Sequence, residues 1–88
     1  MSFSPEAVAE MNVLLLFTPS THLKGIKIHH TADPALVAAA QRLHEQGFIT
    51  QADGGYLTDL GTRASEHAHT LFTMLNAETE SLSASHVG

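Results

Sequence analysis

The chain has 88 residues and a formal net charge of -5, with four lysine and arginine residues against nine aspartate and glutamate residues. This length fits a single small domain, and the lack of cysteine excludes disulfide bridges and thiolate chemistry. The acidic balance leaves little positive charge for neutralising phosphates, on which affinity for nucleic acids largely depends.

Hydropathy and the N-terminal sequence bear on localisation. The longest apolar run, Val13 to Phe17, is far too short to cross a membrane. The residues before it lack the basic and apolar regions of a signal peptide. We therefore expect a cytoplasmic protein that does not bind a membrane.

The first expected helix begins near Pro5, because Ser4 is a good N-cap residue and proline is tolerated at the first helical position. Val8 and Met11 are predicted to face inward. Residues 13–17 are apolar on every side of the helix. Such a helix end is expected both in the core and in a subunit contact.

The segment after Pro19 allows two interpretations. Ile26 and Ile28 alternate with polar residues, which is the period of a half-buried strand and predicts a third short strand at 25–29. The alternative is a single helical turn around residues 20–24, which is the only room for a second helix before the next one. We leave this choice to the structure.

A second helix is predicted from Pro34, capped by Asp33, and it ends at Gly47. Its apolar stripe is predicted to face the core, and the residues between are predicted to face outward. The inward residues are Leu36, Val37, Ala40 and Leu43, and the outward residues are Ala38, Gln41, Arg42 and Glu45.

A β-hairpin is predicted next, from residues 48–50 and 56–58 around Asp53-Gly54-Gly55. A two-residue Asp-Gly turn would place Thr50 opposite Leu57. A three-residue loop that uses Gly55 would put Ile49 and Leu57 on one face of the hairpin. We prefer this second arrangement because it buries both apolar side chains together.

The last expected helix is capped by Thr58 and runs from Asp59 to about Asn76, with Gly61 allowing close packing in its first turn. The domain is thus predicted to span residues 1–76. Residues 77–88 are small and polar, and we predict a flexible tail. The apolar stripe predicted to face the core is Leu60, Ala64, Ala68, Leu71 and Leu75.

Large apolar residues off that stripe predict a homodimer. Phe72 and Met74 would be exposed in a monomer, and the end of the first helix is apolar on all sides. The candidate interface residues are Leu16, Phe17, Phe72, Met74 and Leu75.

The seven histidines do not predict a metal site. The adjacent pair at residues 29 and 30 would point to opposite faces of a strand, and the pair at residues 67 and 69 would diverge on a helix. A more distant set of His22, His44 and Glu66 has no zinc-type spacing. We therefore predict no metal and no cofactor.

Catalytic chemistry finds no support in the sequence. The serines at positions 4, 20 and 65 lack a nucleophile-elbow setting, and Gly54-Gly55 precedes a strand rather than opening a phosphate-binding helix. We expect a protein that is not an enzyme.

The second half of the chain resembles a known fold. Residues 33–68 are similar to the recognition-helix and wing half of winged helix-turn-helix domains, as found in bacterial regulators of the multiple-antibiotic-resistance and phenolic-acid-regulator kinds. The resemblance implies an α+β fold with three main helices and a β-hairpin wing. The residues that carry it are Leu43, Gly47, Phe48, Ile49, Gly55, Tyr56, Leu57, Thr58, Gly61 and Ala64.

The resemblance implies candidate DNA contacts, since the outward face of the second helix would approach the major groove and the wing tip would lie near the backbone. The candidate nucleic-acid-binding residues are Lys24, Lys27, Gln41, Arg42 and Gln51.

Two functions stay open. One is a DNA-binding or transcription-associated regulator that binds double-stranded DNA as a homodimer. The other is a non-catalytic protein-interaction or accessory module that has lost DNA binding. Over its whole length the chain also resembles a small bacterial family of uncharacterised proteins, through SFSPEAVAEMNVLLLF and GIKIHH.

Overall fold

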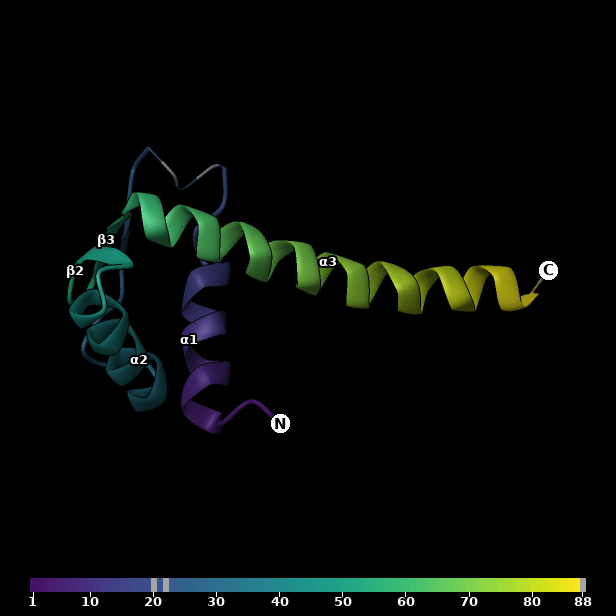
Figure 1. The fold of residues 1–88 in the computed structure, drawn as a ribbon, viewed down its shortest axis with the longest axis horizontal. Helices are drawn as coiled ribbons and strands as arrows, with labels where there is room; N and C mark the ends of the chain where they lie inside the picture. Colours follow the sequence, from purple (N-terminus) through teal and green to yellow (C-terminus); the bar gives the residue numbers. More distant parts are fainter. Residues whose placement is uncertain (20, 22, 88) are drawn as a thin grey trace.

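The fold is of the predicted α+β class. The computed structural model describes residues 1–19, 21 and 23–87, with side chains as far as residue 77. In this part of the chain, three helices surround a three-stranded antiparallel sheet (Figure 1). The elements are α1 (Pro5–Leu15), β1 (Ile26–Lys27), α2 (Pro34–Glu45), β2 (Ile49–Gln51), β3 (Gly54–Leu57) and α3 (Asp59–Val87).

The first two helices begin where the sequence predicts. The Ser4 hydroxyl accepts a hydrogen bond from the amide of Ala7 at 3.0 Å, and a carboxylate oxygen of Asp33 accepts one from the amide of Ala35 at 2.9 Å. Each cap satisfies a backbone donor that has no partner within its helix. Gly47 follows α2 with a φ of 85°, so the expected left-handed stop is confirmed.

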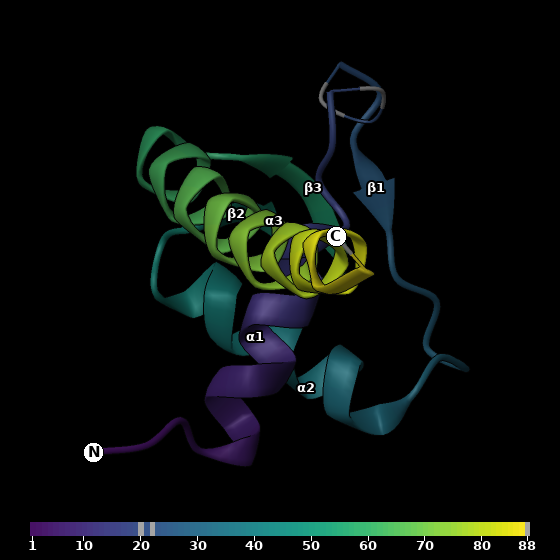
Figure 2. The ribbon, with the colours of Figure 1, turned by 90° about the vertical axis from the view of Figure 1, so that its right-hand side faces the viewer.

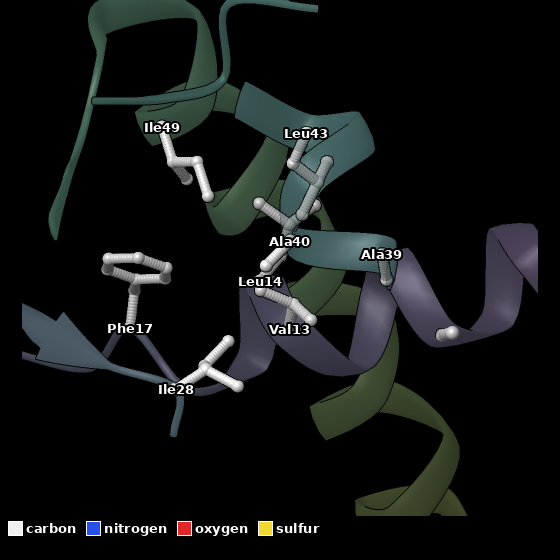
Figure 3. Packing of buried hydrophobic residues seen from close by; sticks show 9 residues of the cluster. Val13, Leu14, Phe17, Ile28, Ala39, Ala40, Leu43 and Ile49 are labelled. Atoms are coloured by element: carbon white, nitrogen blue, oxygen red, sulfur yellow. The ribbon is translucent and has the colours of Figure 1, made fainter. Parts of the chain in front are cut away.

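The core lies between α1, α2 and the sheet (Figure 3). Ala39 and Ala40 are 0% exposed, and their small side chains let the two helices approach closely. Val8 is exposed, so its predicted inward position is wrong, and the buried stripe of α1 continues through Val13 instead. The buried apolar residues are Ala9, Val13, Leu14, Phe17, Ile28, Ala39, Ala40, Leu43 and Ile49.

Ile49 and Leu57 lie on one face of the hairpin, as predicted, because the two residues are paired across the strands. The turn differs from the expected three-residue loop. Gln51 pairs with Gly54, so residues 52 and 53 form the turn and the extra residue lies within β3 as a bulge. Gly55 has a φ of 73°, which only glycine adopts at low cost, and this explains why the bulge sits there.

The third strand is confirmed. β1 pairs with β3 through Ile26 opposite Gly55, which places β3 in the centre of the sheet. Before it, the amide of Gly25 donates to the carbonyl of Thr21 at 2.9 Å and closes one turn. Within the described residues between α1 and α2 there is no second helix. Ser20 and His22, which the helical-turn alternative also invoked, lie outside the described residues.

The third helix starts as expected and runs farther. The amide of Gly61 donates to the Thr58 hydroxyl at 3.0 Å, which confirms the cap. The helix continues to Val87, so its expected end near Asn76 is too early. It crosses α1 and extends past it, away from the rest of the molecule (Figure 1). Figure 2 is the view nearly along α3, with its C-terminal end toward the viewer.

Candidate interaction surface on helix α3

The face of α3 that packs on the body consists of small or polar residues. The Ser65 hydroxyl, which is buried, donates to the carbonyl oxygen of Leu14 at 3.1 Å. One turn later, Nε2 of His69 lies 2.7 Å from the carbonyl oxygen of Phe17. Both bonds satisfy carbonyls at the C-terminal end of α1 and so fix where α3 crosses it.

Gly61 decides how α3 approaches the hairpin. A Cβ atom at this position would overlap the carbonyl oxygen of Phe48. The helix therefore turns its smallest residue toward the hairpin, and the close packing predicted for Gly61 is confirmed. Residues 65 and 68 lie four and seven positions on and return to the same side.

This orientation exposes the leucine stripe. Successive helical residues are rotated by about 100°, so Leu60 lies roughly a quarter turn from Gly61. The sequence assigned Leu60, Leu71 and Leu75 to the core, and that prediction is wrong because all three are exposed. The side of α3 with the small residues therefore packs on the body because it permits close approach, and the more apolar side faces solvent.

We define the apolar face of α3 as five exposed side chains. Residues 60, 71 and 75 lie on one side, since 11 residues are close to three helical turns. Residues 72 and 74 flank them. All except residue 60 follow Ser65 and His69 along α3, which extends past α1 (Figure 1). Their exposed fractions are Leu60 42%, Leu71 42%, Phe72 52%, Met74 61% and Leu75 56%.

The candidate dimer residues divide into two groups. Phe72, Met74 and Leu75 belong to the apolar face, and Leu16 is exposed at the end of α1. Phe17 is only 4% exposed and packs in the core, so it is not a surface residue. The apolar run at the end of α1 thus serves mainly the core.

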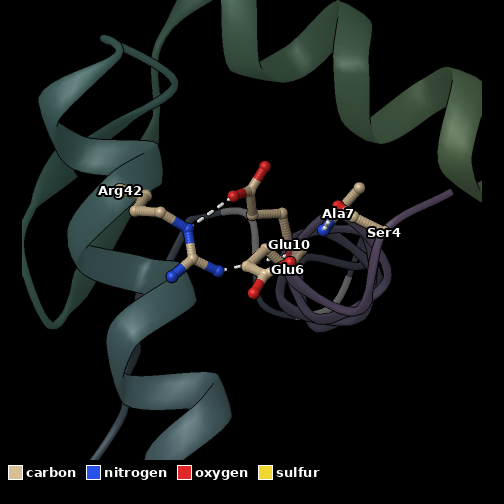
Figure 4. A network of polar contacts seen from close by, with 5 residues as sticks. All are labelled: Ser4, Glu6, Ala7, Glu10 and Arg42. Carbon is tan, nitrogen blue, oxygen red and sulfur yellow. Dashed lines mark hydrogen bonds and ion pairs between the residues drawn. The ribbon is translucent and has the colours of Figure 1, made fainter.

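Arg42 faces α1 instead of solvent. Its Nε lies 2.6 Å from a carboxylate oxygen of Glu10, and its Nη2 donates to the carbonyl oxygen of Glu6 at 3.3 Å (Figure 4). Arg42 is not part of the core, and its long side chain bends across the interface between the two helices. This guanidinium is engaged by α1.

The pair joins α1 to α2 and should contribute to stability. We expect Arg42→Ala to lower the free energy of unfolding by about 1–2 kcal/mol, since it removes a charge-assisted bond and leaves Glu10 partly buried. A double-mutant cycle with Glu10→Gln should give a coupling of about 0.5–1 kcal/mol by chemical denaturation. The exposed Arg63→Ala is the control. Zero coupling would show that the pair is not formed in solution.

The other nucleic-acid candidates come from α2, β1, β2 and the turn before β1. Lys27 and Gln41 line a hollow of about 600 Å³ between β1 and α2, and His29, His30 and Asp53 line it too. Lys24 lies in the turn before β1, and Gln51 ends β2. The lining of the hollow thus includes a carboxylate as well as a lysine, which offsets the positive charge that binding of phosphate needs.

A second hollow of about 820 Å³ separates α3 from the segment after α1. Its lining is largely apolar, and Glu66 and His69 are its titratable residues. Nothing in the sequence pattern indicated this hollow, because it arises where two segments about 50 residues apart meet at Phe17 and His69.

Within the described residues, no group of three or more histidine, aspartate or glutamate side chains could hold a metal ion. In the same part of the chain, none of the helices combines the length and the apolar character that a membrane crossing requires.

Comparison with known proteins places the chain in a family. Residues 1–76 match a family of unknown function (DUF5669), and the chain belongs to that family. The matched region includes α1, α2, the sheet and the part of α3 up to residue 76, with the whole apolar face of α3. Neither a curated protein nor a solved structure matched the chain.

Proposed function

We propose that this chain is a non-catalytic protein-interaction module that presents the apolar face of α3 to a protein partner. The observation that supports it best is the clustering of five large exposed apolar side chains on one helix. Contiguous exposed apolar surface on a small domain is typical of an interaction site, whereas scattered apolar residues are not.

The geometry of α3 adds a second argument. The helix α3 extends past α1 (Figure 1), and Leu71, Phe72 and Met74 follow Ser65 and His69, whose side chains bond to backbone carbonyls of Leu14 and Phe17. A helical segment gains most of its stability in water from packing of its apolar side, and a segment of this length is marginal alone. A partner that covers Leu71 and Phe72 would both stabilise the helix and remove apolar surface from water.

A photo-cross-linking experiment tests this proposal. A benzophenone amino acid at position 72 should give covalent protein adducts in cells that express the chain. The same group at Thr73, which is exposed one residue farther around the helix, is the matched control and should give far fewer. Adducts that are equally rare at both positions would contradict the proposal.

DNA binding is the second candidate, favoured by the β2–β3 hairpin that follows α2 as a wing would. Three features argue against it: a formal net charge of -5, the engagement of Arg42 by Glu10, and a strand where a second helix would be expected. We expect no binding of random duplex DNA at about 50 mM salt. Binding that weakens steeply with added salt would support the regulator instead.

A further inference from the structure

We propose that the hollow between β1, α2 and the hairpin turn binds a small zwitterion of the amino-acid type, which carries an ammonium group, a carboxylate and an apolar side chain. The described residues that line this hollow lie between positions 27 and 53, whereas α3 begins at Asp59. The inference therefore goes beyond the proposed function and does not depend on the apolar face of α3.

The walls of the hollow are held in place by the sheet and the core. The amide of Ile28 donates to the carbonyl oxygen of Asp53 at 2.8 Å, and Lys27 pairs with Gly54. These contacts fix the hairpin turn beside the end of β1. On α2, Val37 lines the hollow and packs against the core. The fold itself therefore forms the hollow, as is usual for small-molecule sites.

The size and the lining of the hollow fit a small organic molecule. Its volume of about 600 Å³ lies within the range of roughly 300–1,000 Å³ that is typical of ligand pockets. Ile28 and Val37 are apolar parts of the lining, and Lys27, Gln41 and Asp53 are polar parts. An apolar wall with a few polar groups both binds a ligand and fixes its orientation.

The charges of the lining are of opposite sign and are not paired with each other. With histidine neutral at pH 7, Lys27 and Asp53 are the charged side chains among the described residues of the lining. Among the described side chains, the one ion pair joins Arg42 to Glu10. Lys27 and Asp53 are therefore both open to a ligand that carries one group of each sign, through charge-assisted hydrogen bonds.

This pattern of charge disfavours other classes of ligand. An anion such as phosphate would be attracted by Lys27 and repelled by Asp53, and a simple cation would meet the reverse. A wholly apolar molecule would remove both charges from water without replacing their hydrogen bonds. A zwitterion compensates both charges at once.

The groups of the ligand can be assigned to the lining. Its ammonium group donates to the Asp53 carboxylate, and its carboxylate accepts from the Lys27 ammonium and the Gln41 amide. Its apolar side chain covers Val37, which is half-buried. Because Lys27 and Gln41 are exposed, their bonds compete with water, and we expect a dissociation constant on the order of 0.1–1 mM.

Nuclear magnetic resonance tests the site with L-leucine as the probe. Saturable shifts are expected for the amides of residues 27–30, 37–41 and 52–53, and none for those of residues 71–75. Two analogues of leucine are the matched ligand controls. 4-Methylpentanoate lacks the ammonium group and 3-methylbutylamine lacks the carboxylate, so each should bind at least about 10-fold more weakly.

Two substitutions test the charged residues. Lys27→Gln and Asp53→Asn should each raise the dissociation constant for leucine at least about 5-fold, because each removes one charge-assisted bond. Lys24→Gln and Glu45→Gln remove an exposed charge of the same sign outside the lining and are the matched controls. They should leave the dissociation constant within about 2-fold, since solvent screens distant charges.

The outcomes that overturn the proposal are distinct. A lack of saturable shifts at about 10 mM leucine means that the hollow is not this site. If 4-methylpentanoate or inorganic phosphate binds as tightly as leucine, the hollow is an anion site instead. Circular dichroism establishes that the variants remain folded. If Lys27→Gln or Asp53→Asn proves unfolded, the comparison of leucine with its two analogues on the natural chain decides.

Discussion

Gly61→Ala is expected to lower the free energy of unfolding by more than about 3 kcal/mol, which could leave little folded protein. The reason is steric, because the new Cβ atom would overlap the Phe48 carbonyl oxygen. That oxygen also accepts the backbone bond from Thr58 at 3.0 Å, so α3 could not move away without losing the joint between hairpin and helix. Thermal and urea unfolding followed by circular dichroism measure the change.

The expected loss of stability for Gly61→Ala is opposite to what helix propensity alone predicts. The variant therefore tests the close approach of α3 to the hairpin. In an exposed helix, replacing glycine by alanine stabilises by about 1 kcal/mol. Gly47→Ala is the matched control, since it has a φ of 85° but no atom within 4 Å of the added Cβ. It should cost only about 1 kcal/mol. A Gly61→Ala protein as stable as the natural one would contradict the close approach.

Ile49→Ala should destabilise the protein by about 2–5 kcal/mol, through lost apolar burial and the cavity that remains. Ile49 is among the largest fully buried side chains and lies opposite Leu57 in the hairpin. The same unfolding measurement applies. The loss should appear as a lower denaturation midpoint with an unchanged slope.

Two variants calibrate this result. Ile49→Val should cost about 0.5–1.5 kcal/mol, because it removes one methylene group. Gln51→Ala, exposed on the same strand, should change stability by less than about 0.5 kcal/mol. If Ile49→Ala cost no more than Gln51→Ala, the register that buries Ile49 would be wrong.

The features that the sequence predicted correctly are those with a local cause. Ser4 and Asp33 start helices because each side chain bonds to an amide two or three residues later. The shared face of Ile49 and Leu57 in the hairpin is also decided within a few residues. In the same way, alternation around Ile26 indicated β1 as one of two interpretations of its segment.

The orientation of α3 could not be read in this way. One side of the helix carries large apolar residues, including Leu60 and Leu71, and another carries small residues, including Gly61 and Ser65. Hydrophobic periodicity predicts that the large apolar side packs on the core. The choice depends on how near the Phe48 carbonyl approaches, which is a tertiary property. The residue that the pattern did indicate was Gly61, because glycine in a helix usually has a packing reason.

Parts of the candidate sites could not be predicted from the sequence, because they depend on contacts between residues that are far apart in the chain. Arg42 has an outward position on the helical wheel, yet its side chain bonds to Glu10 on another helix. The pairing between His69 and the carbonyl of Phe17 likewise joins positions that no local pattern connects. The apolar face was found in part, since Phe72 and Met74 were predicted as dimer contacts while Leu60 and Leu71 were assigned to the core.

The claim that α3 is an interaction helix is tested most directly by hydrogen exchange of the backbone amides of residues 70–77, in the free protein and in the complex with the partner captured through position 72. This segment extends past α1 (Figure 1), so its lasting protection should depend on a partner. The account predicts rapid exchange in the free protein and strong protection in the complex, with the amides of α2 unchanged. Exchange of residues 70–77 that is equally fast with and without the partner would contradict it.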